Sequence, residues 1–201
     1  MEALSPVTAG KRVAIYGGSF DPPHNGHVLA VTWCACLLDE AGLARFDEVR
    51  VVPVFGHAFG KALTPFETRV AMIEDATRHL GARVVVDRIE ATLPVPSYTV
   101  DTLRAMRARE PGLEATLVVG ADAWAERRAW REWDELARLV DHRFVVLGRA
   151  GVPDPEGAAL EVHLPGLSST EVRRRARAGE PYWWMVPEAV AARVAREGLY
   201  R

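Results

Sequence analysis

The sequence predicts an α/β fold in which a mainly parallel β-sheet carries helices on both of its faces. Short apolar runs of strand length alternate with longer helical segments along the whole chain. Glycines, prolines or polar residues separate most of these segments. Strands that alternate with helices favour parallel pairing, because each helix serves as the crossover between two strands.

The first part of the chain begins with a strand, a helix and a second strand. Residues 13–16 form a short apolar run that Gly17 and Gly18 end, which is typical of a buried strand. Residues 27–38 are apolar and long enough to form a helix. Residues 49–54 are the second apolar run and the second predicted strand.

A capping signal marks the start of the next helix. Thr64 can cap it, Pro65 suits its first position and Glu67 completes a capping box. We expect this helix to continue to about Leu80 and to end at Gly81.

The alternation continues to residue 164. The third predicted strand covers residues 83–87, and Thr99 can cap a helix over residues 100–109. The later predicted segments are a strand over 115–119, a Trp-rich helical stretch over 126–140, a strand over 144–147 and a sixth strand over 160–164.

These elements together predict a doubly wound, Rossmann-like fold. A length of 201 residues indicates a single domain over residues 1–201, with residues 1–10 as a flexible N-terminal extension. Sheets of this kind place their sites at the carboxyl ends of the strands, near the point where the strand order reverses.

Composition and charge exclude several classes of protein. A net charge of −2 gives no indication of a nucleic-acid or membrane partner, so an anion site must be built locally. Cys34 and Cys36 have neither redox nor zinc spacing. Residues 1–10 lack the apolar run of a signal peptide, and no stretch is long enough to cross a bilayer. A cytoplasmic enzyme is therefore expected.

The first motif follows the first predicted strand and reads Gly17-Gly18-Ser19-Phe20-Asp21-Pro22-Pro23-His24-Asn25-Gly26-His27. Glycines after a strand let backbone amides approach a phosphate, and the next helix N-terminus adds partial positive charge. The glycine spacing fits neither the GxGxxG fingerprint nor a P-loop. The alternative is a strand–loop–helix corner with two capping histidines.

The second motif reads Leu167-Ser168-Ser169-Thr170-Glu171-Val172-Arg173. Ser168 and Glu171 form a capping box, so a helix begins here. Its free amides, three hydroxyls and Arg173 suit a polyphosphate. Taken alone, the segment is more typical of a capped basic surface helix, with Arg174 and Arg175 in solvent.

Together the two motifs resemble those of the HxGH nucleotidyltransferase superfamily, and in detail the chain resembles bacterial nicotinate-nucleotide adenylyltransferases. His24 and His27 carry the HxGH pattern and Leu167–Arg173 the SSTxxR pattern. Residues 96–102 look like the pyridine-site segment of these enzymes. Gly120-Ala121-Asp122 with Trp130 matches their GxD…W pattern. The resemblance covers almost the whole chain, and the last two matches narrow it to pyridine nucleotides.

The resemblance implies a set of site residues. It assigns catalysis to His24, His27 and Arg173. It assigns ATP binding to Gly17, Gly18, Ser19, Phe20, Gly120, Asp122, Ser168, Ser169 and Thr170. It assigns pyridine-nucleotide binding to Tyr98, Thr99, Val100, Trp130 and Arg131.

Individual roles follow from the same resemblance. Asp122 is expected to bind a ribose hydroxyl and Trp130 to stack on the pyridine ring. Backbone amides near Thr99, Val100 and Arg131 are expected to receive the pyridine carboxylate, which agrees with the free amides of a helix start. The alternative for Trp130 is a packing role, because Trp124 and Trp133 lie in the same segment.

One loop departs from the family pattern. The family has a compact Pro-Pro-His-Lys or Pro-Pro-His-Arg after the second strand, whereas this chain has Phe55-Gly56-His57-Ala58-Phe59-Gly60-Lys61. His57 and Lys61 are candidate phosphate ligands. A surface histidine and a solvated lysine are an equally good interpretation.

The expected reaction joins ATP to nicotinate mononucleotide and needs no nucleophilic side chain. The mononucleotide phosphate attacks the α-phosphorus of ATP, while the protein aligns two polyanions and neutralises charge on the leaving pyrophosphate. Magnesium is expected to arrive on the ATP phosphates, because the sequence has no carboxylate cage. A zinc site on His24 and His27 is rejected for want of further ligands. The sequence gives no oligomeric state.

Three alternatives remain at this stage. The same chemistry could use nicotinamide mononucleotide, pantetheine phosphate or a cytidylyl acceptor. A nucleotide-binding regulator without catalysis is a second alternative, against which the intact His24, His27 and Arg173 argue. A redox enzyme with an NAD site is a third, and the missing GxGxxG pattern argues against it.

Overall fold

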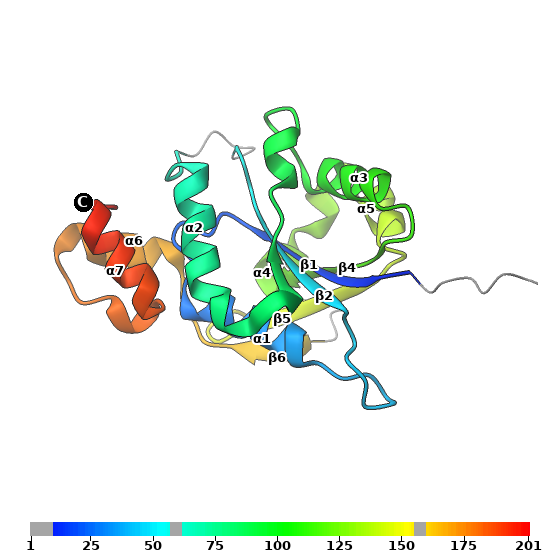
Figure 1. Cartoon of the computed structure of the whole chain (residues 1–201), viewed down its shortest axis with the longest axis horizontal. Coiled ribbons are helices and arrows are strands. Elements are labelled where there is room, and N and C mark those ends of the chain that lie inside the picture. The colour runs from blue at the N-terminus through cyan, green and yellow to red at the C-terminus, as the bar shows by residue number, and fades with distance from the viewer. Residues whose placement is uncertain (1–9, 57–61, 155–159) are drawn as a thin grey trace, which may run out of the picture.

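The computed structural model describes residues 10–56, 62–154 and 160–201, and its centre is one six-stranded sheet (Figure 1). The strand order is β3-β2-β1-β4-β5-β6, and all five pairings are parallel. The strands are β1 (Arg12–Gly18), β2 (Glu48–Pro53), β3 (Val84–Val86), β4 (Glu114–Gly120), β5 (Phe144–Arg149) and β6 (Leu160–Leu164). The predicted doubly wound α/β fold is confirmed, and so are its six strands.

Seven α-helices and four short 3₁₀ turns connect the strands in the part of the chain that the structure describes. The α-helices are α1 (Asn25–Cys36), α2 (Phe66–Thr77), α3 (Thr99–Arg109), α4 (Ala121–Ala125), α5 (Trp133–Leu139), α6 (Ser169–Ala178) and α7 (Glu188–Glu197). The 3₁₀ turns are η1 (Arg78–Arg83), η2 (Ile89–Thr92), η3 (Arg127–Ala129) and η4 (Trp183–Met185).

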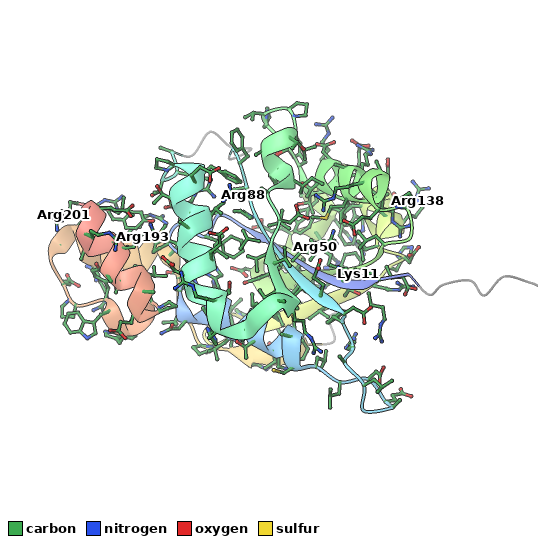
Figure 2. All side chains as sticks on the ribbon, in the orientation of Figure 1. Lys11, Arg50, Arg88, Arg138, Arg193 and Arg201 are labelled. Carbon is green, nitrogen blue, oxygen red and sulfur yellow. The ribbon has the colours of Figure 1, made fainter. Side chains whose placement is uncertain are left out.

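The two faces of the sheet carry separate cores, as the alternation of strand side chains requires. Val13 and Ile15 of β1 belong to a core with α3 and α5, whereas Ala14 belongs to a core with α1. A third apolar cluster joins α2 to α6 and α7, which lie together at one end of the molecule (Figure 1). An ion pair of 2.6 Å from Arg193 of α7 to Asp75 of α2 reinforces this contact (Figure 2).

The strand order reverses between β1 and β4, and there the sheet opens at its carboxyl edge. Pairing between these strands ends at Tyr16 opposite Val118, although β1 pairs with β2 as far as Gly18 opposite Pro53. Gly17 and Gly18 therefore have no partner on the β4 side. A crevice at such a switch point is where doubly wound sheets bind their ligands.

Two helix starts differ from the prediction. Pro65, not Thr64, is the N-cap residue of α2, without a side-chain cap bond, and the backbone N–H of Thr64 donates instead to Asp21 Oδ2 at 3.3 Å. Tyr98, not Thr99, is the N-cap residue of α3, and its N–H donates to Asp101 Oδ2 at 3.1 Å. In both cases the expected threonine lies one residue away from the cap position.

The Trp-rich stretch is not the single helix that we predicted over residues 126–140. It contains η3 and α5, separated by extended backbone at Trp130 and a left-handed Glu132 at φ 53°. Arg104 of α3 forms ion pairs with Glu132 and with Glu135, the second at 2.6 Å. These contacts from another helix stabilise the break between η3 and α5. Contacts from another helix thus override the local preference for one continuous helix. The end of α2 was also predicted three residues too late, because η1 takes over at Arg78.

Candidate active site

The two histidines of the HxGH loop cap helix α1 by binding each other's backbone. The N–H of His27 donates to His24 Nδ1 at 3.3 Å, and the N–H of His24 donates to His27 Nδ1 at 3.1 Å. The two rings are stacked with their centroids 3.6 Å apart. Because Nδ1 accepts in both rings, geometry assigns the proton of each neutral ring to Nε2. Each ring therefore keeps one N–H donor that the helix cap does not use.

Burial makes both imidazoles neutral. Burial, and after it the positive charge of Arg149, lower the pKa of His24 to about 4. The pKa of His27 lies well below the usual value, first because of burial and then because of His24 and Arg149. At neutral pH these rings are hydrogen-bond donors, not cations. Positive charge at this end of the crevice must come from arginines and helix N-termini.

Helix α6 is bonded directly to the HxGH loop, although about 150 residues separate them in the sequence. Ser169 Oγ donates to the carbonyl of Pro22 at 2.8 Å, and Arg173 Nη1 donates to the carbonyl of Asp21 at 2.6 Å. Arg173 Nη2 also donates to Thr170 Oγ1 at 3.3 Å. The structure therefore brings together the two motifs that the sequence analysis paired.

The start of α6 has only half of the predicted capping box. Ser168 Oγ accepts from the N–H of Glu171 at 3.2 Å, as expected. The Glu171 carboxylate, however, binds Arg174 at 2.8 Å and Arg175 at 2.7 Å instead of returning to Ser168. Arg174 is exposed, as expected, whereas Arg175 is half-buried, and both form ion pairs with Glu171. Their ion pairs leave Arg173 as the arginine of this cluster that faces the loop.

Arg149 is a site residue that the sequence analysis missed. It ends β5, and its Nη2 lies 3.0 Å from Asp122 Oδ2. Both side chains line a cavity of about 200 Å³ together with His24 and His27. Gly17 and Gly120 also line this cavity. The available signal was an arginine directly after a predicted strand, at the edge where such folds build their sites.

Arg69 is a second missed residue, and it fixes the loops around the crevice. Its side chain is 1% exposed and donates to the carbonyls of Ser19 at 2.8 Å, Val54 at 2.7 Å and Thr64 at 2.9 Å. Burial lowers the pKa of this guanidinium, but an arginine remains charged in proteins. One buried cation thus ties the loop after β1 to the loop after β2 and to the start of α2.

The C-terminal segment also closes on the HxGH loop. Tyr200 donates its hydroxyl proton to the buried Asp21 at 2.6 Å. Burial raises the pKa of this phenol, and the bond to Asp21 raises it further. The loop that carries the histidines is therefore held from three sides, by α6, by Arg69 and by Tyr200.

The other end of the crevice is a cavity of about 600 Å³, and the predicted pyridine-site residues line it. The cavity is lined by Gly18, Ser19, Tyr98, Thr99, Val100, Trp130 and Arg131, among others. The Arg131 guanidinium lies 4.9 Å from the centre of the Tyr98 ring, a cation–π contact. A smaller cavity of about 250 Å³ shares Gly17 and Gly120 with the histidine cavity and Trp130 with this one. The three cavities form one crevice across the ends of β1 and β4.

The structure shows different surroundings for the three tryptophans, whose roles could not be distinguished from the sequence. Trp124 and Trp133 pack on Phe144, with ring centroids 5.0 Å and 5.4 Å away, and so belong to the core beside α3. Trp130 has an edge contact of 6.2 Å with Trp133 and otherwise lines the cavities. Of the three, Trp130 is the one that lines the 250 Å³ and 600 Å³ cavities, although it packs against the same core cluster.

Glu90 is a third residue that the sequence analysis missed. It lies in η2, is 6% exposed, and lines both the 250 Å³ and the 600 Å³ cavities. Ser97 Oγ and Thr102 Oγ1 each donate to one of its carboxylate oxygens. A glutamate after a predicted strand has no distinctive sequence pattern, so nothing in the sequence singled it out.

Some expectations fall outside what the structure describes. His57 and Lys61, the candidate phosphate ligands, lie in residues 57–61, which are not among the described residues. Within the described ranges, no cluster of three or more His, Cys, Asp and Glu side chains is arranged to hold a metal ion. None of the helices described is long and apolar enough to span a membrane.

Comparison with known proteins gives three kinds of match. A family model described as cytidylyltransferase-like matches residues 15–175. A probable nicotinate-nucleotide adenylyltransferase from Anaeromyxobacter dehalogenans is 40% identical over 197 residues, which cover 97% of this chain and 100% of that protein. A protein of the same description from Leifsonia xyli is 36% identical, and the match covers 94% of each chain.

A solved structure shares the fold at low sequence identity. It is the nicotinic acid mononucleotide adenylyltransferase of Plasmodium falciparum, solved in complex with NaAD. The match has a TM-score of 0.76 at 18% identity and covers 94% of this chain and 97% of that one. At this identity the match supports the fold, while the likeness to the bacterial proteins also extends to sequence.

Proposed function

This chain belongs to the cytidylyltransferase-like family and, within it, to the nicotinate-nucleotide adenylyltransferases; from that premise we propose how the residues of its crevice carry out the reaction. The enzyme transfers AMP from ATP to nicotinate mononucleotide, which yields nicotinate adenine dinucleotide and pyrophosphate in NAD biosynthesis. The observation that carries the assignment of the site is a single crevice with a histidine-lined end and a tryptophan-lined end.

In the proposed reaction, an oxygen of the mononucleotide phosphate attacks the α-phosphorus of ATP. The bond from that phosphorus to the β-phosphate bridging oxygen breaks, and pyrophosphate leaves with the electron pair. The protein aligns the two phosphates and stabilises the charge that grows on the leaving group. No side chain of the chain forms a covalent bond in this scheme.

We assign this charge stabilisation to the histidine end of the crevice. His24 and His27 donate through Nε2, and the start of α6 offers free amides with the hydroxyls of Ser168, Ser169 and Thr170. Arg173 and Arg149 supply the positive charge that the neutral imidazoles lack. Glycines 17, 18 and 120 let ATP approach the backbone, with Ser19 and Phe20 beside them.

Asp122 has a double role in this proposal. Its carboxylate pairs with Arg149 at 3.0 Å. When ATP binds, phosphate oxygens compete for Arg149, and the freed carboxylate accepts a hydrogen bond from a ribose hydroxyl. Magnesium would arrive with ATP as part of the substrate, because among the described residues Asp122 is the only carboxylate that lines the 200 Å³ cavity.

The pyridine ring of the mononucleotide is assigned to the other end. Trp130 stacks on the ring, and the free amides of Thr99 and Val100 at the start of α3, together with the backbone near Arg131, receive its carboxylate. Asp101, the acidic residue of this segment, is already directed at other donors. Its oxygens already take the N–H of Tyr98 at 3.1 Å and Arg104 Nη1 at 3.2 Å. The acid should therefore be preferred over the amide.

We also propose the setting in which the enzyme works. A single domain over residues 1–201 acts in the cytoplasm on small-molecule substrates, without nucleic-acid or membrane partners. The net charge of −2 and the local arginine clusters support this, because positive charge is concentrated where phosphates are expected.

The test compares adenylyl transfer to the two mononucleotides side by side. Dinucleotide formation and pyrophosphate release from ATP are measured with nicotinate and with nicotinamide mononucleotide as acceptor. Each unpaired buried polar group costs about 1–3 kcal/mol, so kcat/KM should favour the acid by roughly ten- to a hundredfold. A ratio near one, or in favour of the amide, would contradict the carboxylate site at α3. No pyrophosphate with either acceptor would contradict the function.

A further inference from the structure

The carboxylate of Glu90 is a buried charged group that the proposed reaction does not use. It is 6% exposed and lines both cavities that meet at the pyridine end, as Thr99 and Trp130 also do. A buried carboxylate is costly to desolvate unless it is compensated. Its place on the wall of a ligand cavity suggests that part of the compensation comes from the ligand.

The bonds that Glu90 makes within the protein hold it in place without neutralising it. Ser97 Oγ donates to Oε2 and Thr102 Oγ1 donates to Oε1. Both donors are neutral hydroxyls, which hold the carboxylate in place but bring no positive charge to it. Among the described basic side chains, none forms an ion pair with Glu90. Within the part of the chain that the structure describes, the carboxylate therefore has only hydroxyl partners beside the cavity.

The acceptor substrate carries the charge that would complement it. The pyridine nitrogen of the mononucleotide is bonded to ribose, so the ring is a permanent pyridinium cation at any pH. The same ring bears a carboxylate, for which the cavity offers helix amides and the exposed Arg131. A cavity with a buried carboxylate and a guanidinium at its exposed rim suits a zwitterionic ring.

We propose that Glu90 is a specificity-determining residue whose negative charge selects acceptors with a cationic, pyridinium ring. This proposal rests on the function proposed above and refines the substrate class of its pyridine site. Opposite charges attract more strongly in a partly dry cavity than in water. Glu90 thus favours the oxidised pyridine ring over a neutral ring of the same size and substitution.

The test pairs the variant Glu90→Gln with two acceptors that differ in ring charge. One is nicotinate mononucleotide, and the other is its 1,4-dihydropyridine form, in which an added hydride at C4 makes the ring neutral and non-aromatic. Both keep the ring carboxylate and the attacking phosphate. We expect Glu90→Gln to lower kcat/KM for the pyridinium acceptor by about tenfold and to change that for the dihydropyridine acceptor by less than about twofold. The KM for ATP should not change.

Glu126→Gln is the matched control. Glu126 lines the same 600 Å³ cavity, but it is exposed, so water screens its charge. Removing its charge should leave the ratio between the two acceptors within about twofold of the parent ratio. Glu90→Asp keeps the charge and should retain most of the preference for the pyridinium form, even if its shorter side chain lowers the overall rate.

The outcomes separate the proposal from a merely structural role. If Glu90→Gln lowers kcat/KM equally for both acceptors, Glu90 only supports the fold of the pocket and the proposal is overturned. If the variant does not fold, the two acceptors are compared with the parent chain alone. Equal kcat/KM for the two acceptors in the parent would then overturn the proposal. If the parent makes no dinucleotide from either acceptor, the proposed function itself fails, which is a distinct result.

Discussion

The histidine end and the tryptophan end of the crevice are built in different ways. At the histidine end, most of the fixed bonds reach backbone atoms: Ser169 and Arg173 donate to carbonyls of the HxGH loop, and Arg69 donates to three more carbonyls. At the tryptophan end, the shape depends on contacts between side chains, such as Arg131 over Tyr98 and Trp130 against Trp133.

This difference follows from what each end must do. Charge grows on phosphate oxygens during the reaction, so donors there must be in place beforehand and reorganise little. Recognition of the pyridine ring depends instead on the shape and charge of the cavity that receives it. Substitutions at the histidine end should therefore act on turnover and on ATP affinity, and those at the tryptophan end mainly on acceptor affinity.

The strongest test of this contrast is His27→Ala. Loss of one positioned donor to a developing charge typically lowers turnover by about two to three orders of magnitude. We expect kcat to fall by that amount, measured as pyrophosphate release, while the KM for nicotinate mononucleotide changes little. Turnover within threefold of the parent would remove His27 from catalysis.

A matched variant separates catalysis from capping. His27 Nδ1 accepts the N–H of His24, so His27→Ala also weakens the start of α1. In His27→Asn the side-chain oxygen can accept that N–H, but the distal donor is lost. This variant should therefore keep the thermal stability of the parent and lose as much turnover as His27→Ala.

The second expected effect is on stability as a function of pH. The pKa of His24 is about 4 in the folded chain, whereas an unfolded histidine titrates near its usual value of about 6.5. Below pH 6.5 the unfolded chain binds a proton that the folded chain does not, so stability falls as the pH falls from about 6.5 towards 4. Between pH 7 and pH 5 this histidine alone should remove about 2 kcal/mol from the free energy of unfolding.

Urea unfolding at the two pH values checks this, with His24→Asn as the control. The variant keeps a short side chain that can accept at the cap position but has no titratable ring. Its stability should depend on pH less steeply than that of the parent, by about the same 2 kcal/mol. Identical pH dependence in both proteins would show that His24 titrates normally in the folded chain and is not held neutral.

The third effect belongs to Arg173, at the edge of the histidine end. A hydrogen bond to a charged group contributes about 1.5–3 kcal/mol, so Arg173→Ala should raise the KM for ATP by about tenfold or more. The KM for the mononucleotide should change less. Arg177→Ala, one turn further along α6 and exposed, is the control and should leave both values unchanged. Equal loss of affinity for both substrates would indicate that Arg173 only holds α6 against the loop.

The fold could be predicted from the sequence because its signals are local. Apolar runs such as residues 13–16 and 49–54 are buried on both faces of the sheet, and no other element suits such short runs. The break in the Trp-rich stretch could not be predicted, because it depends on Arg104 of α3, about 28 residues away along the chain. Cap positions were wrong by one residue, as at Thr64, whose backbone N–H donates to Asp21 Oδ2 on a distant loop.

The candidate site divides in the same way. Ser169 and His24 stand within short motifs whose residue types suggest phosphate binding, and the structure places those motifs side by side. Arg69, Arg149 and Glu90 were missed, because an isolated charged residue acquires meaning only when the fold buries it or places it beside a cavity. Sequence patterns thus identified the motif-bearing residues, while the lone charges around them required tertiary structure.

The smallest expected effect tests the tryptophan end alone. Trp130 lines the pyridine cavity, whereas Trp133 stacks on Phe144 with ring centroids 5.4 Å apart. Aromatic stacking contributes about 0.5–1.5 kcal/mol beyond area burial, so Trp130→Ala should raise the KM for nicotinate mononucleotide by about three- to tenfold. Because Trp130 does not line the histidine cavity to which the phosphates are assigned, kcat and the KM for ATP should stay close to those of the parent.

Trp133→Ala makes this last prediction a comparison. It removes a ring of the same size from the same segment, but from the core and not from the cavity wall, so it should lower the unfolding temperature by several degrees. The folded fraction of Trp133→Ala should retain the mononucleotide KM of the parent. If Trp130→Ala instead destabilises the chain as much and leaves the KM unchanged, then Trp130 is a packing residue. The pyridine ring would then have to bind against Tyr98 and Arg131 without a stacking partner from this segment.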